Sequence, residues 1–274
     1  MKLFIYWFLA VIITLSAVIY QRKTGPTYDK KGEVSIDGQV IEYALIRSHG
    51  GESDALVEIE VQDNDISGEI MYKKYPTNDE WTKIKMLRNQ DLLTGTLPYL
   101  PPAGKYEYII TLNKNGNSFP LNDGKPVIIR FKGAVPNGVL IPHVILMFVA
   151  MLLGNLAGIM AVFRHKKYKI YTLLTLITLF LGGLILGPWV QWHAFGEAWA
   201  GVPFAWDLTD NKTLVAFIFW LLAFIFNHKK ERPIMVIIAA LVMLAVYSIP
   251  HSMFGSELDP ETGEIIQGMI FLIF

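Results

Sequence analysis

The feature that most constrains this chain is a set of apolar runs, each about as long as a helix that crosses a bilayer. The first run, Leu3–Tyr20, is followed by a polar stretch, and four more runs come after Pro136. A helix needs about 20 mainly apolar residues to cross the hydrocarbon core of a membrane. The later runs are Val139–Phe163, Ile170–Leu186, Thr209–Phe226 and Ile234–Ile249, the last with an extension to Phe254. The sequence therefore predicts a membrane α-helical bundle of five spans.

The first run has two interpretations, a membrane anchor and a cleaved signal peptide. Its apolar stretch is longer than the usual core of a signal peptide, and no A-x-A cleavage site follows it. We therefore expect residues 1–24 to form an uncleaved N-terminal anchor.

Two short basic segments predict the orientation of the spans. Arg164–Lys169 and His228–Arg232 lie in short loops, where the positive-inside rule counts charges, so both are expected on the cytoplasmic side. Arg22 and Lys23 argue weakly for the opposite orientation. The expected location is a bacterial-type inner (plasma) membrane with a cytoplasmic N-terminus. Alternation of the spans then places residues 25–136, the loop 188–212 and the tail 255–274 on the outer side.

Residues 25–136 have a different pattern, in which apolar and polar residues alternate in short runs. Alternation with a period of two is typical of half-buried strands, and Gly, Pro, Asn and Asp separate the runs as they do in turns. Asn113–Asn117 and Asn122–Gly124 are expected hairpin turns. The segment predicts an all-β sandwich of about seven strands. Its clearest runs are Gln39–Ile46, Ala55–Val61, Glu69–Tyr72, Lys83–Leu87, Lys105–Leu112 and Val127–Lys132.

One run adds a resemblance to a known fold. Ala103–Tyr108, with the sequence AGKYEY, resembles the strand F region of immunoglobulin-like and fibronectin-like domains. This resemblance covers one strand, and the cysteine pair of antibody domains is absent. It implies an extracytoplasmic immunoglobulin-like sandwich inserted between the anchor and a four-span membrane domain, residues 137–254. The chain as a whole resembles bacterial multi-pass membrane proteins, which implies a location and no function.

Composition excludes several classes of function. The 24 basic and 24 acidic residues give a net charge of +0, so no overall positive field favours nucleic-acid binding. Cys 0 excludes disulfides, c-type haem, thiolate zinc sites and iron–sulfur clusters. No G-x-S-x-G, H-E-x-x-H or phosphate-binding glycine loop occurs, so no catalytic residue is assigned and the question of an enzyme stays open.

Two polar features inside the predicted elements have structural interpretations. Gly154 and Gly158 flank Asn155 in a pattern that favours close helix packing with an interhelical hydrogen bond. The chain has no internal repeat of the kind that secondary transporters show. Asp63-Asn64-Asp65 could bind calcium, but such a triplet more often caps a turn.

The candidate chemistry lies at the outer rim of the predicted bundle. His143 and His251 each follow a proline near the outer end of a span, and His193 lies just beyond the third span. The outer loop 188–212 holds several of the 7 tryptophans. Neutral imidazole is the commonest ligand of metals and haem, and a b-type haem needs two axial ligands in an aromatic slot.

The loop carries a second resemblance. Phe204-Ala205-Trp206-Asp207 resembles the W-x-W-D segment of the haem-handling proteins of cytochrome c maturation. By that resemblance Trp206 and Asp207 match the end of the motif, and His143 and His251 stand for its flanking histidines, with His193 as an alternate ligand. Val202, Pro203 and Phe204 replace the dense tryptophans of that family.

The same residues also have plain structural interpretations. Tryptophan is enriched at membrane interfaces, and Asp207 precedes a predicted helix, where a carboxylate caps the N-terminus. His143 and His251 can be interfacial groups with one hydrogen bond each.

Two functions therefore stay open. The first is a membrane scaffold or accessory protein that presents the sandwich to an extracytoplasmic protein partner. The alternative is a b-type haem or metal protein at the outer membrane face that handles haem or transfers electrons.

Overall fold

The computed structural model describes residues 2–250, 257–259, 262–263 and 265–266. The chain divides into two compact units. The helical unit contains the described residues up to Pro26 and those from Val135 to Gly255. The β unit contains Thr27–Ala134 and the described residues of Ser256–Ile266. Each unit has its own apolar core.

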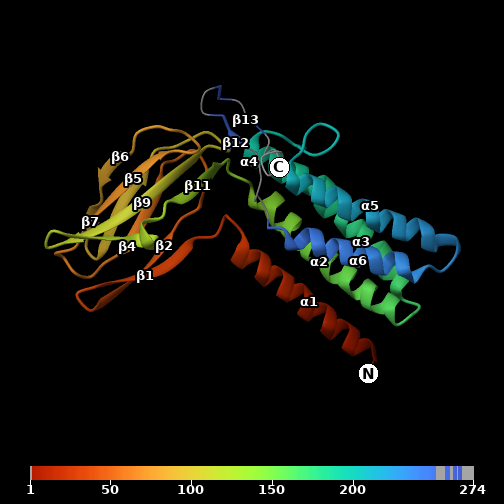
Figure 1. The fold of residues 1–274 in the computed structure, drawn as a ribbon. Helices are drawn as coiled ribbons and strands as arrows, with labels where there is room; N and C mark the ends of the chain where they lie inside the picture. The colour runs from red at the N-terminus through yellow and green to blue at the C-terminus, as the bar shows by residue number, and fades with distance from the viewer. Residues whose placement is uncertain (1, 251–256, 260–261, 264, 267–274) are drawn as a thin grey trace. The chain divides into compact units, whose positions relative to one another are not determined.

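The helical unit is built from the predicted apolar runs (Figure 1). Within the described residues, 4 helices are long and apolar enough to cross a membrane, whereas Pro233–Ser248 is apolar but shorter. Tyr168–Phe195 is one continuous helix in three parts, with a π-helical middle. The elements are α1 Lys2–Thr24, α2 Asn137–Val162, α3 Tyr168–Leu179, η2 Phe180–Leu186, α4 Gly187–Phe195, α5 Leu208–Lys229 and α6 Pro233–Ser248.

The helix α3-η2-α4 is longer than the predicted span. The apolar run ends at Leu186, but the helix continues to Phe195 and stops at Gly196, which has a φ of +81°. Glycine adopts this left-handed conformation without a steric penalty and therefore ends helices. The expected outer loop 188–212 is accordingly wrong at both ends, because Gly187–Phe195 and Leu208–Lys229 are helical.

Small residues allow α2 to pack closely on its neighbours. A Cβ atom on Gly158 would lie 2.6 Å from the Cβ of Ala240 in α6, and one on Gly154 would lie 2.8 Å from Met243 Sδ. The buried Asn155 donates from Nδ2 to Thr14 Oγ1 of α1 over 2.9 Å. The structural interpretation of Gly154, Asn155 and Gly158 is confirmed.

The two basic loops lie at the same end of the helical unit, which we call the basic end. Tyr168 Oη donates to Asn227 Oδ1 over 2.8 Å, and Lys169 Nζ lies 3.3 Å from Glu231 Oε1. The beginning of α1 is also at this end, because the ring of Tyr6 stacks on that of Phe163 at 5.2 Å. The helices therefore alternate in direction, and the end of α1 and the beginning of α2 both lie at the opposite end.

The β unit contains two larger sheets, antiparallel except for the parallel pair β3-β11, and a separate hairpin (Figure 1). One sheet has the order β3-β11-β9-β5-β6, with β10 paired to β9, and the second has the order β4-β8-β7. The hairpin is β1-β2. The strands are β1 Lys30–Ile36, β2 Gln39–Leu45, β3 Ser48–Gly50, β4 Ala55–Glu60, β5 Ser67–Lys74, β6 Thr82–Lys85, β7 Leu87–Asn89, β8 Leu92–Leu97, β9 Lys105–Lys114, β10 Asn117–Pro120 and β11 Val127–Lys132.

The core of the β unit follows from the alternating pattern. Strand β4 alternates buried and exposed residues throughout, and its Ala55, Val57 and Ile59 join the core. All the expected strand runs contain strands, and the expected turn before β10 has positive φ at Asn115 and Gly116. Positive φ at both central residues is the geometry of a type I′ hairpin.

The described part of the C-terminal tail belongs to the β unit. Glu257–Leu258 (β12) and Ile265–Ile266 (β13) pair with each other, and Leu258 N donates to Ala103 O over 3.2 Å. Lys105 Nζ contacts Glu257 Oε1. Burial lowers the pKa of Lys105, and the hydrogen bond with Glu257 partly offsets this effect. The final apolar residues 267–274 lie outside the described residues.

Candidate functional site

The side chain of His143, the first candidate ligand, forms a hydrogen bond with the π-helical segment. It lies in the second turn of α2, partly buried, and its Nδ1 lies 2.9 Å from Gly182 O. A carbonyl oxygen only accepts, so Nδ1 carries the proton and donates. The same carbonyl accepts from Gly187 N in the π-helical pattern. His143 therefore ties α2 to η2, and its Nε2 is the nitrogen left for a ligand.

The other two histidines do not form a described site with His143. His193 lies in the last turn of α4, not beyond it, and its ring contacts that of Trp192 with centroids 4.9 Å apart. His251 lies outside the described residues. Among the residues that the structure describes, no group of three His, Cys, Asp or Glu side chains is placed to hold a metal ion. A haem or metal role for His143, His193 and His251 stays a prediction.

Asp207 is the N-cap of α5. It is 4% exposed, and its Oδ1 accepts from Thr209 N at 2.7 Å and from Asp210 N at 3.1 Å. A carboxylate in this position satisfies backbone donors that the helix itself leaves unpaired. Trp206, which precedes it, is 60% exposed. The capping role accounts for Asp207, whereas Trp206 is an exposed side chain.

The loop between α4 and α5 is fastened to the start of α5 by side chains. Asp210 Oδ2 accepts from Ala200 N at 2.6 Å, and Asn211 Oδ1 accepts from Val202 N at 2.8 Å. Gly201 fits tightly here, because a Cβ atom on it would lie 2.8 Å from Asp210 Cβ. The loop and α4 carry large exposed apolar side chains at this end, which we call the aromatic end: Trp189, Trp192, Val202, Phe204 and Trp206.

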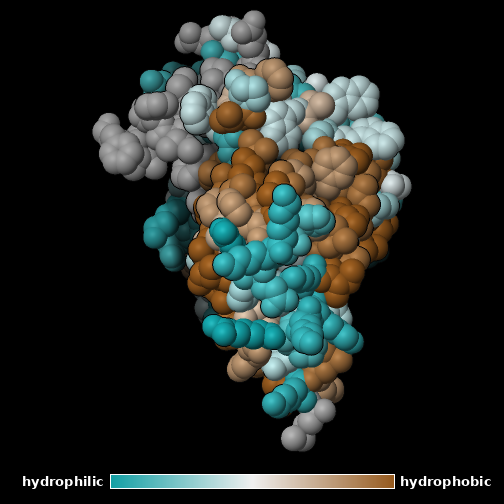
Figure 2. Space-filling model, turned by 90° about the vertical axis from the view of Figure 1, so that its right-hand side faces the viewer, coloured by the Kyte–Doolittle hydropathy of each residue, from teal (hydrophilic) through white to brown (hydrophobic). Residues whose placement is uncertain are grey.

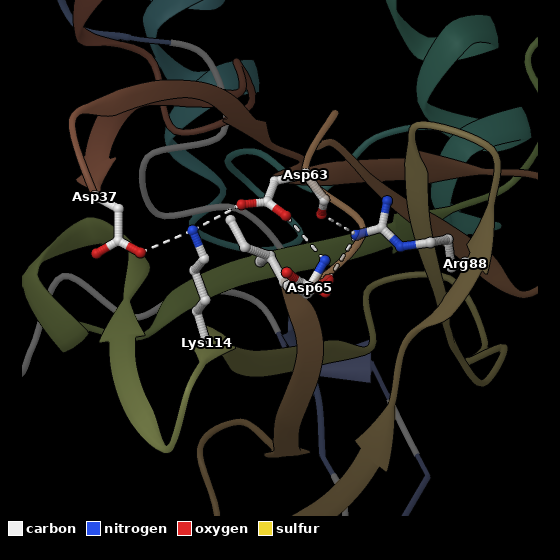
Figure 3. Close-up of polar contacts among 6 residues, drawn as sticks. Asp37, Asp63, Asp65, Arg88 and Lys114 are labelled. Carbon is white, nitrogen blue, oxygen red and sulfur yellow. Dashed lines mark hydrogen bonds and ion pairs between the residues drawn. The ribbon is translucent and has the colours of Figure 1, made fainter.

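The calcium interpretation of Asp63-Asn64-Asp65 is not favoured by its surroundings, because a lysine already binds the carboxylate. Lys114 Nζ lies 2.8 Å from Asp63 Oδ2 and 2.7 Å from Asp37 Oδ2 (Figure 3). Asp63 Oδ1 also accepts from Asp65 N at 2.9 Å, which is the expected turn cap. Arg88 donates to Asp63 O and to Ile66 O and holds the same turn.

This cluster shifts the ionisation of its members in opposite directions. The hydrogen bond from Lys114, followed by that from Asp65 N, lowers the pKa of Asp63 below its ordinary value. The hydrogen bonds to Asp37 and Asp63 raise the pKa of Lys114. The three charges join the β1–β2 turn, the β4–β5 loop and the end of β9, so their role is structural.

A groove in the β unit was not predicted from the sequence. It has a volume of about 650 Å³ and lies between the β1-β2 hairpin and strand β4, with Leu92 of β8 at its border. Glutamates dominate its charged lining, and Glu33 stands directly opposite Glu42 in the β1-β2 register. Its lining residues are Lys31, Gly32, Glu33, Glu42, Tyr43, Ala44, Glu58, Ile59, Glu60 and Leu92. We call it the acidic groove.

The four glutamates of the acidic groove outnumber its single lysine, Lys31. All four are exposed, and none has a salt bridge within the described part of the chain. Like charges directly opposite each other on paired strands are destabilising. Strand β4 is also an edge of its sheet, because it pairs with β8 on one side only. The sequence feature that pointed to this groove was the outward alternation of Glu58 and Glu60. The sequence alone could not place the β1-β2 hairpin beside them.

Comparisons with known proteins identified no relative of this chain. No protein-family model matches the chain, and no curated protein matches it.

Proposed function

We propose that this chain is a multi-pass protein of a bacterial-type inner membrane that holds an immunoglobulin-like sandwich on the extracytoplasmic side and presents it to a protein partner. The observation that carries the proposal is the division of the chain. A helical unit of membrane-length apolar helices and a β unit with a separate core are joined by the end of α1 and the beginning of α2.

Exposed side chains of the helical unit support membrane insertion. Large apolar residues such as Phe4, Phe8 and Leu15 of α1 are more than one third exposed, which is costly in water and favourable in lipid. Tryptophans gather at the aromatic end, as they do at membrane interfaces. Helix α6 has 16 residues, and a short span is accommodated by local thinning of the bilayer at a modest cost.

The strand order supports the immunoglobulin-like assignment. In that fold one sheet contains strands B, E and D, and the other contains C, F and G. The orders β4-β8-β7 and β11-β9-β5 correspond to these two sets in sequence and in space. Strand β9 then takes the place of strand F and begins inside the segment Ala103–Tyr108, which resembles that strand.

The arrangement of the loops supports the orientation. Arg164–Lys169 and His228–Arg232 share the basic end, and clustered lysine and arginine in short loops favour the cytoplasm. The end of α1 and the beginning of α2 lie at the other end. The β unit connects to both, so it is proposed to face outward.

Topology is tested by labelling introduced cysteines, because the native chain has Cys 0. Glu80→Cys lies in an exposed loop of the β unit, and Lys166→Cys lies at the basic end. We expect a membrane-impermeant maleimide to label Glu80→Cys in intact cells and Lys166→Cys only after permeabilisation. The reverse pattern would overturn the orientation, and full extraction of the protein at alkaline pH would overturn membrane insertion.

The acidic groove is the proposed contact surface for the partner, which is expected to offer a basic, extended segment. Such a segment adds to a free strand edge through backbone hydrogen bonds and gains charge complementarity from the glutamates. A photo-crosslinking residue at Ala44, inside the groove, is expected to capture one partner from native membranes. Glu58→Lys with Glu60→Lys should abolish that adduct, whereas Glu52→Lys, outside the groove, should not. An adduct that still forms in the Glu58→Lys, Glu60→Lys variant would contradict this assignment.

A further inference from the structure

A second groove lies in the helical unit, at the basic end. It has a volume of about 580 Å³ and is lined by the last turns of α5 and the loop that follows. Its floor is apolar, and two of its side chains, Ile225 and Phe226, are 53% and 41% exposed. Its rim is cationic, with Lys229, Lys230 and Arg232 among the lining residues. We call it the basic-end groove.

The cationic side chains of this groove are free of carboxylates. Glu231, the acidic residue of the loop, forms its salt bridge with Lys169 of α3, at 3.3 Å. No salt bridge joins Lys229, Lys230 or Arg232 to a carboxylate within the described part of the chain. In the space-filling view from this side, hydrophilic residues form a patch bordered by hydrophobic surface (Figure 2).

The loop that carries these charges is held in place by a buried side chain. Asn227 is 4% exposed, its Oδ1 accepts from Arg232 N at 2.8 Å, and its Nδ2 donates to Arg232 O at 3.0 Å. Tyr168 Oη donates to the same Oδ1. The guanidinium of Arg232 lies 5.5 Å from the ring centre of Phe226. The loop backbone is therefore arranged before any ligand binds, which reduces the ordering cost of binding.

We propose that the basic-end groove binds an anionic phospholipid. Its phosphate would lie at Lys229, Lys230 and Arg232, and an acyl chain would lie along Phe224, Ile225 and Phe226. The C-terminal end of α5 suits such a lipid, because its apolar surface continues directly into cationic side chains. An anionic lipid likewise has an apolar chain next to a negative headgroup. The proposal rests on the membrane insertion proposed above.

The test uses the full chain purified in a neutral detergent and two lipids with identical acyl chains, phosphatidylglycerol and phosphatidylcholine. Native mass spectrometry counts the lipids retained by the protein. We expect phosphatidylglycerol to be retained in preference to phosphatidylcholine. The triple variant Lys229→Gln, Lys230→Gln, Arg232→Gln should bind phosphatidylglycerol at least about tenfold more weakly.

A matched variant distinguishes an effect of the groove residues from an effect of the overall positive charge at the basic end. The control is the triple variant Arg164→Gln, Lys166→Gln, Lys167→Gln. It removes the same positive charge from the other loop at the basic end but changes no residue that lines the groove, so lipid binding should stay within about twofold. Equal losses in both triple variants, or equal retention of the two lipids by the unchanged protein, would overturn the proposal.

Two further measurements test whether the acyl chain contributes to binding. Ile225→Asn should weaken binding of phosphatidylglycerol, and glycerol phosphate, which has no acyl chain, should not compete with the lipid. Competition by glycerol phosphate would mean a phosphate site without an acyl groove and would overturn the proposal. Resistance of the protein to alkaline extraction reports on membrane insertion alone, so its failure is distinguishable from a failure of lipid selectivity.

Discussion

Asn155 and Thr14 are joined by a buried hydrogen bond that links α2 to α1 across 141 positions of sequence. Thr14 Oγ1 in turn donates to Ala10 O of its own helix at 2.7 Å, so the hydroxyl group both donates and accepts. In an apolar surrounding an unpaired amide is costly, and this bond satisfies one of the two amide hydrogens of Asn155. The pair therefore fixes the position of α1 on the bundle.

A double-mutant cycle on this pair should show coupling. We expect Thr14→Val and Asn155→Ala each to destabilise the helical unit, with a coupling energy of about 0.5–2 kcal/mol, the range for hydrogen bonds between membrane helices. Unfolding in mixed micelles measures it. Thr24→Val is the control on the same helix, since Thr24 is exposed and bonds to Tyr20 O of its own helix. Strict additivity of Thr14→Val and Asn155→Ala would contradict the pairing.

Close contact of α2 with α6 predicts a second effect. Gly158→Ala should destabilise the protein by about 1–3 kcal/mol, because the new Cβ atom would lie 2.6 Å from that of Ala240. Gly138→Ala, on the same helix, meets no atom within 4 Å and should leave the stability unchanged or raise it. Thermal unfolding of the variants measures both. Adding Ala240→Gly to Gly158→Ala should restore part of the loss, and no recovery would argue against this contact.

Local patterns in the sequence were sufficient for most of the secondary structure. Apolar length predicted the helices except α4, which continues beyond the apolar run into the expected loop, and alternation predicted the main strands of the β unit. Strand β8, Leu92–Leu97, was missed because its residues do not alternate and Gly95 interrupts it. Gly95 leaves room for the side chain of Ile70, since a Cβ atom there would lie 2.6 Å from Ile70 Cδ1. That reason is visible only in three dimensions.

The candidate sites were less predictable, because they depend on contacts between distant segments. The capping role of Asp207 could be inferred from its neighbours in sequence. The lysine that bridges Asp37 and Asp63 could not, because Lys114 comes from another strand. Similarly, the acidic groove depends on the position of the β1-β2 hairpin beside β4, which no local pattern specifies.

The Lys114 cluster predicts a pH dependence of the β unit. The pKa of Asp63 is lower in the folded chain than its ordinary value of 3.8, so its contribution to stability is present above that value and is lost as the pH falls below it. Lys114 has a raised pKa, so its contribution is present below its ordinary value of 10.5 and is lost at higher pH. The effect is small because these half-buried groups lie at the protein surface, where solvent screens their charges.

Unfolding midpoints of the full chain across acidic pH test this expectation. Asp63→Asn should lower the midpoint at neutral pH and flatten its decline below pH 3.8. Asp79→Asn, in an exposed loop of the same unit, should leave both unchanged. A profile for Asp63→Asn that is parallel to that of the unchanged protein would show that the carboxylate contributes nothing.

The scaffold proposal and the haem alternative differ in the absorption spectrum of the purified protein. In the scaffold proposal, His143 is a structural donor to Gly182 O, so protein from haem-supplied cells should show no Soret band. His143→Gln, which keeps an amide donor, should then be more stable than His143→Ala, because the carbonyl of Gly182 retains a side-chain partner. A Soret band that is lost in His143→Ala and His251→Ala but kept in His165→Ala would instead support axial ligation. His165 is the suitable control because it lies in the loop at the basic end, where its Nδ1 accepts from Lys167 N.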